Sequence, residues 1–199
     1  LIRESLSKPA YKEKLRLRSY GVPDMDSKVF LEIKKKYRGL VNKRRTILEL
    51  GEAYDFIETG VKPELQDYMN GQVLNELEYC LNLYDLEPKV YIAYDRLAYF
   101  EKGNDDLRIS FDTNIRTRRS DLLLESGDHG KRLLDSDVWL MEIKTSLAKP
   151  LWLCEMLSEF EIRSSSFSKY GTEYKNMMAR HKEMPKQKIF VFGNQKQAV

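Results

Sequence analysis

Lysine and arginine occupy every second position in one early stretch of the sequence, YKEKLRLRSY (residues 11–20). Successive side chains of a β-strand point to opposite faces, so this spacing places Lys12, Lys14, Arg16 and Arg18 on one face. Like charges that stand side by side on one face repel one another. The pattern therefore predicts a strand whose charged face is either solvated by water or bound to something anionic.

Four later segments show the same separation of charged from apolar positions. The polar positions that share one face are Glu32, Lys34 and Lys36 in 28–37, Tyr94 and Arg96 in 89–100, Arg108, Ser110 and Asp112 in 107–113, and Glu142 and Lys144 in 138–145. Apolar residues fill most of the alternating positions on the opposite face. Strands with one apolar and one charged face are therefore the main building element that we expect.

These strands can form an open sheet with a solvated outer face, or a sheet that closes around a polar lumen. The number of arginines, which contact phosphate in a bidentate manner, favours the closed form. Apolar residues at helical spacing predict a helical insertion at 46–86 and helices near 149–160 and 172–181. We therefore predict an α+β fold: an antiparallel β-barrel with a basic lumen, covered by helices, in a single domain over residues 1–199.

The composition narrows the class of partner. Thirty-four basic residues face 31 acidic ones, a net charge of +3, so we expect a local anion site and no nucleic-acid binding. Cys80, Cys154, His129 and His181 lack the spacing of a metal site, and the cysteine usage predicts a reduced, cytoplasmic protein. No run approaches the roughly 20 apolar residues of a transmembrane helix. We therefore expect no membrane segment in this chain.

Six segments together carry a resemblance to a known family: YKEKLRLRSYG, FLEIKKKY, YIAYDRLAYF, LRISFDTNIR, LMEIK and FSKY. In this order they resemble the vacuolar transporter chaperone (VTC) domain, in its bacterial type. This domain is the polyphosphate polymerase branch of the CYTH-like superfamily of triphosphate tunnel enzymes. The resemblance runs from Leu1 to about Met178. Because the sequence opens after the family's first strand, we expect that N-terminal strand to be absent from this chain.

The resemblance implies a function and a set of site residues. It implies a phosphotransferase that moves the γ-phosphate of ATP onto polyphosphate or pyrophosphate inside a basic tunnel, with Mn²⁺ or Mg²⁺. By motif, the catalytic residues are Arg16, Arg18, Lys34, Arg96 and Arg108, and the metal-binding carboxylate is Glu142. The residues that bind phosphate or nucleotide are Lys14, Tyr94, Lys144, Ser168 and Lys169. The family also allows a membrane-associated partner.

Several alternatives stay open at this point. Arg16 and Arg18 can belong to a solvated strand face, Glu142 can be the ion-pair partner of Lys144, and Tyr94 can simply pack. Ser168 can cap a helix, because serine is a favoured N-cap residue. Trp139 and Trp152 are expected in the core. Besides the polymerase, the candidate functions are a tunnel-type triphosphatase or polyphosphatase and a non-catalytic sensor of polyphosphate or nucleotide.

Overall fold

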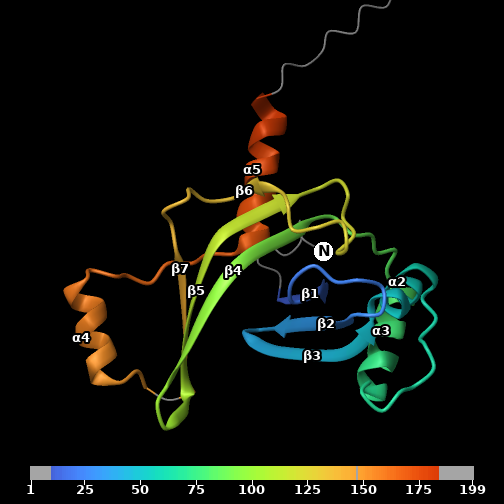
Figure 1. The fold of residues 1–199 in the computed structure, drawn as a ribbon, viewed down its shortest axis with the longest axis horizontal. Helices are drawn as coiled ribbons and strands as arrows, with labels where there is room; N and C mark the ends of the chain where they lie inside the picture. Colours follow the sequence, from blue (N-terminus) through green and yellow to red (C-terminus); the bar gives the residue numbers. More distant parts are fainter. Residues whose placement is uncertain (1–9, 147, 184–199) are drawn as a thin grey trace, which may run out of the picture.

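The computed structural model describes residues 10–146 and 148–183, which form two antiparallel sheets and four helices (Figure 1). The N-terminal sheet contains β1 (Tyr11–Arg18), β2 (Lys28–Tyr37) and β3 (Leu40–Glu49), in that order. The C-terminal sheet is built on β4 (Tyr91–Glu101) and β5 (Asn104–Arg118). β5 also pairs with β6 (Lys131–Arg132) and with β7 (Leu140–Lys144).

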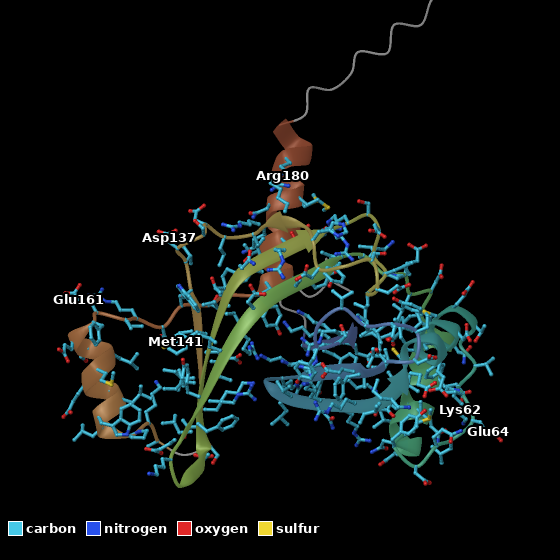
Figure 2. The ribbon with its side chains drawn as sticks, in the orientation of Figure 1. Lys62, Glu64, Asp137, Met141, Glu161 and Arg180 are labelled. Carbon is cyan, nitrogen blue, oxygen red and sulfur yellow. The ribbon has the colours of Figure 1, made fainter. Side chains whose placement is uncertain are left out.

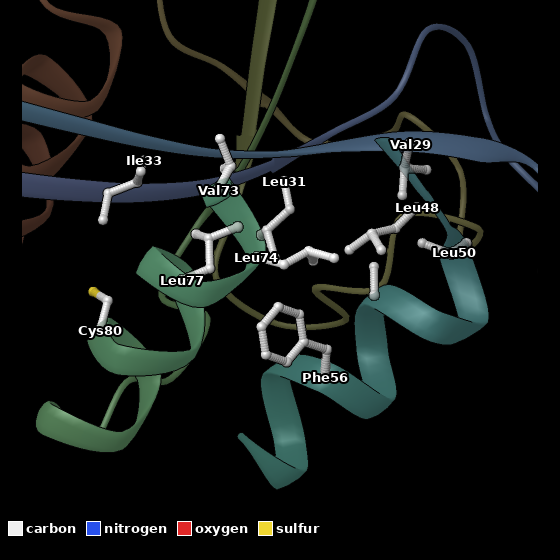
Figure 3. Packing of buried hydrophobic residues seen from close by; sticks show 11 residues of the cluster. Val29, Leu31, Ile33, Leu48, Leu50, Phe56, Val73, Leu74, Leu77 and Cys80 are labelled. Carbon is white, nitrogen blue, oxygen red and sulfur yellow. The ribbon is translucent and has the colours of Figure 1, made fainter. Parts of the chain in front are cut away.

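The N-terminal sheet buries its apolar face against α2 (Leu50–Thr59) and α3 (Gly71–Leu83). Figure 3 shows Leu31, Phe56 and Leu74 at the centre of this contact. A capping box between Glu49 and Glu52 begins α2, and Gly60 ends it in the left-handed conformation that glycine adopts without strain. Asn70 caps α3 by accepting a hydrogen bond from the backbone N–H of Val73. These local signals fix the two helices beneath the sheet.

The C-terminal sheet is longer and less covered. β4 and β5 pair along most of their length, with a shift of register between Ala93 and Asp95. α5 (Lys169–Glu183) contacts β5 through the ion pair of Lys169 with Asp112, and Glu173 of the same helix pairs with Arg119, the residue that follows β5. α4 (Leu151–Glu159) lies at one side of the molecule, away from the N-terminal sheet (Figure 1).

The α+β class and the antiparallel strands are confirmed, with differences in detail. Among residues 10–146 and 148–183 the strands form two separate sheets and do not close into one barrel. Alternation alone did not distinguish these arrangements, because an open sheet and a closed one have the same period. The helix expected at 172–181 begins earlier, at Lys169. None of the helices in the described residues is long and apolar enough to cross a membrane.

The expectation that both tryptophans lie in the core is wrong. Trp139 is 50% exposed just before the edge strand β7, and Trp152 is 42% exposed on α4. Trp152 donates its indole N–H to a carboxylate oxygen of Glu101, at 3.2 Å. An apolar side chain is buried only where another element covers it, and both residues lie at the periphery of the C-terminal sheet.

Candidate functional site

The register of the N-terminal sheet places cations abreast on its polar face. Lys14 pairs with Lys34, which pairs in turn with Lys43 on β3. In the next row on the same face, Arg16 and Arg45 flank Glu32. The cations predicted from alternation therefore lie together, and β3 adds two that were not among the predicted site residues.

The lysine row is electrostatically strained. Burial lowers the pKa of Lys14 first, and the charges of Lys12 and Lys34 lower it further. Lys43 is paired with Glu32, but no ion pair to a carboxylate is seen for Lys14 or Lys34 among the described residues. An anion that binds beside these two ammonium groups supplies the missing opposite charge. This row is therefore the part of the sheet best suited to phosphate.

Glu32 is the counter-anion of the next row and is only 3% exposed. Its Oε2 accepts hydrogen bonds from Nε of Arg16, at 2.9 Å, and from Nη2 of the same guanidinium. Its Oε1 lies 3.5 Å from Nη2 of Arg18 and 3.1 Å from Nζ of Lys43. Burial alone would raise the pKa of Glu32, but Arg16, Lys43 and Arg18 outweigh it and hold the pKa below its usual value. The carboxylate is therefore ionised and shared by three cations.

The C-terminal sheet has a matching arrangement around Asp112, which is 1% exposed. Arg96 donates to Oδ1 through Nε, at 2.5 Å, and to Oδ2 through Nη2, at 2.8 Å. Lys169 of α5 also donates to Oδ2, and its ammonium lies 4.4 Å from the ring centroid of Tyr94. Burial would raise the pKa of Asp112, but these two cations hold it below its usual value. The hydrogen bond to Asp112 in turn raises the pKa of Arg96.

The remaining predicted residues of this sheet lie on the same face, farther along the strands. Ser110 pairs with Glu142 and Arg108 pairs with Lys144 across β5 and β7. Oε2 of Glu142 lies 3.8 Å from Nη2 of Arg96, and its Oε1 lies 3.5 Å from Nζ of Lys144. Nε of Arg108 is buried and has no hydrogen-bond acceptor among the described residues. Arg108 is therefore a cation with unused donor capacity.

The first turn of α5 links the two charged faces. Ser168 precedes the helix and accepts a hydrogen bond from the backbone N–H of Gly171, at 3.2 Å, as an N-cap residue does. Lys169 binds Asp112 of the C-terminal sheet, and the ring of the next residue, Tyr170, lies 5.9 Å from Nζ of Lys14 on the N-terminal sheet. The two faces therefore approach one another at this turn.

In the part of the chain that the structure describes, a metal ion would need oxygen ligands from a bound phosphate in addition to those of the protein. The described part of the chain contains no group of three or more His, Cys, Asp and Glu residues arranged to hold an ion. Glu142, whose side chain is half-exposed, is the carboxylate of this face that is open to solvent. Mg²⁺ is commonly held by one or two carboxylates plus substrate phosphates, so Glu142 suits a shared site of that kind.

Sequence reasoning missed some residues that the structure brings together. Lys43 and Arg45 lie on the polar face of β3, and their alternation in VNKRRT was the available signal. Glu32 and Asp112 were expected on the charged faces, but only the strand register shows that each is surrounded by cations. Arg118 has a different role, since its guanidinium donates to the carbonyl oxygens of Asp121, Leu123, Gly127 and His129.

A family model, the VTC domain, matches residues 1–178, which include both sheets and the first turns of α5. No curated protein matches the chain.

Proposed function

The chain belongs to the VTC domain family, and on this premise we propose that it is an ATP-dependent polyphosphate polymerase. The family match supports a function related to polyphosphate. The reaction transfers the γ-phosphate of ATP to the end of a polyphosphate chain. In this proposal the polar faces of the two sheets are walls of the family's tunnel.

One observation carries the proposal: two cation-rich sheet faces are joined through consecutive residues of one helix turn. Lys169 contacts the face of Arg96 and Asp112, while Tyr170 contacts Lys14 beside Lys34. A linear polyanion needs such a series of cations rather than a single strong site. Phosphoryl transfer itself requires positioning and neutralisation of charge more than a protein nucleophile.

The transfer proceeds by exchange of one phosphorus–oxygen bond. A terminal oxygen of the chain attacks the γ-phosphorus, the bond from that phosphorus to the β–γ bridging oxygen breaks, and ADP leaves with the bond's electron pair. Arg16, Lys34, Arg96 and Arg108 neutralise the phosphate oxygens on the two walls. Glu142 would hold Mn²⁺ or Mg²⁺ together with phosphate oxygens, and the ion would neutralise developing charge there.

The test is incubation with ATP and Mn²⁺ or Mg²⁺, with products separated on a gel stained for polyphosphate. We expect long chains and ADP from the wild type, and at least a hundredfold lower rate from Arg16→Ala and Glu142→Ala, as for loss of one charge-stabilising group. Lys62→Ala is the matched control, because Lys62 lies in the connection between α2 and α3, far from β4 and β5 (Figure 2).

Other products would identify the alternatives. Release of phosphate without chains would indicate a triphosphatase. Absence of turnover, with tight polyphosphate binding that depends on Arg16, would indicate a sensor and would contradict the polymerase.

A further inference from the structure

In each sheet, a buried carboxylate forms ion pairs with two or three cations of the candidate site. Glu32 neutralises Arg16, Arg18 and Lys43 in the N-terminal sheet. Asp112 neutralises Arg96 and Lys169 in the C-terminal sheet. Both side chains are almost completely inaccessible to solvent, whereas their cationic partners are partly exposed. The carboxylates thus lie behind the cations, and a ligand meets the cations first.

This arrangement limits what the two arginines can offer to a phosphate. A guanidinium grips an oxyanion most strongly through two parallel N–H donors on one edge. Arg16 uses Nε and Nη2 on Glu32, and Arg96 uses Nε and Nη2 on Asp112. The edge formed by Nε and Nη2 is therefore occupied in both, which leaves the end formed by Nη1 and the second N–H of Nη2. Each arginine is held in place for an end-on contact with phosphate.

The two carboxylates also weaken the electrostatic attraction of the cations for a phosphate ligand. Before any ligand binds, five cations on the two walls are paired with Glu32 or Asp112, and Arg96 also lies 3.8 Å from Glu142. Their attraction for a polyanion is correspondingly weaker than that of five uncompensated cations. A chain that must advance by one phosphate after each transfer requires contacts strong enough to orient it and weak enough to release it, as ions do in a multi-site pore.

We propose that Glu32 and Asp112 are positioning residues that hold the arginines for end-on contact and weaken the grip on phosphate, so that a polyphosphate chain can move along the site. This inference rests on the proposed function for the movement of the chain. The predicted effect on binding does not rest on the proposed function, because it concerns only the affinity of the site for any condensed phosphate.

The experiment compares Glu32→Gln and Asp112→Asn with the wild type by calorimetric titration with tripolyphosphate at several salt concentrations. The amides keep the shape and one acceptor oxygen but remove the charge. We expect tripolyphosphate to bind about tenfold more tightly, with a steeper loss of affinity in salt. With ATP and metal, we expect both kcat and KM to fall and the chains made in a fixed time to be shorter, because the chain advances along the site more slowly.

A matched control separates local from global charge. Glu64→Gln changes the net charge equally, and Glu64 is an exposed residue on the opposite side of α2 and α3 from the two sheets (Figure 2). It should bind tripolyphosphate as the wild type does. Glu32→Ala, which removes acceptor as well as charge, should bind less tightly than Glu32→Gln, because Arg16 loses its fixed orientation.

The outcome that overturns the proposal is unchanged or weaker tripolyphosphate binding in a folded amide variant, as a purely structural ion pair would give. If one amide variant fails to fold, the other decides the question, because the two carboxylates lie in different sheets. A wild type that binds tripolyphosphate but makes no chains would refute the polymerase, and the binding comparison would still judge the inference.

Discussion

The two sheets have similar charged faces, but their opposite, apolar faces are covered to very different degrees. The N-terminal sheet is sealed on its apolar side by α2 and α3 around eleven buried residues. The C-terminal sheet leaves large apolar side chains such as Leu97 and Tyr99 more than half exposed. Yet each polar face places a buried carboxylate among arginine and lysine. The charged face is therefore built by strand alternation and register, and it does not depend on how the opposite face is packed.

The largest expected effect concerns stability, and it sharpens this comparison. Phe56→Ala empties a fully buried position beneath the N-terminal sheet and should lower the free energy of unfolding by about 3–5 kcal/mol. Tyr99→Ala removes an aromatic ring that is 56% exposed on the C-terminal sheet and should cost less than about 1 kcal/mol. Urea denaturation followed by circular dichroism measures both. Similar losses would show that the second sheet is covered in solution.

The next largest effect tests whether Arg118 stabilises the C-terminal sheet and the loop that follows β5. Arg118 is 8% exposed, its guanidinium lies 3.6 Å from the ring centroid of Tyr91, and it donates to four carbonyl oxygens of the following loop. Arg118→Ala would leave these acceptors without their donor, so we expect a loss of about 3 kcal/mol. Arg132→Ala, at an exposed position of β6, should change stability by less than about 0.5 kcal/mol.

Thermal unfolding of the two variants makes the measurement. Equal melting temperatures would mean that the loop is held by other contacts and that Arg118 is dispensable. A normal melting temperature with lost tripolyphosphate binding would instead place Arg118 in the anion site.

The sequence predicted which face of each strand is charged, but not which charged residues lie side by side on neighbouring strands. A period of two decides which side of a strand Arg16 or Arg96 occupies. The structure adds that Arg16 lies opposite Glu32 and Arg96 lies opposite Asp112 on the neighbouring strands. Which charges meet across strands depends on register, which the alternation leaves free in steps of two residues. The row of Lys14, Lys34 and Lys43 was for this reason visible only in the structure.

Tertiary context explains the other differences. α5 begins at Lys169, three residues before the expected start, because Ser168 caps it and Asp112 binds its first side chain. Trp139 and Trp152 are apolar enough for a core, but their exposure depends on whether another element covers them. Closure of the strands into one barrel depends on contacts between the sheets, and no local pattern encodes it.

The smallest effect is a dependence on pH that both sheets should share. Glu32 and Asp112 have pKa values held below their usual range by the cations around them, against the opposing effect of burial. In the unfolded chain these groups titrate at about 4.3 and 3.9. A carboxyl with a depressed pKa stabilises the folded state above its unfolded pKa, and this contribution is lost as the pH falls through the folded pKa. We therefore expect wild-type stability to decline from about pH 4 downward.

Urea titrations between pH 7 and pH 3 can assign this decline to each sheet. Glu32→Gln and Asp112→Asn lack the titrating group, so each should be less stable than the wild type at pH 7 and should lose less stability in acid. Glu64→Gln, with its exposed carboxyl removed, should follow the wild type. If only one amide variant shows a smaller loss of stability in acid, the two carboxylates do not contribute equally to folding. The similarity between the sheets is then limited to their geometry.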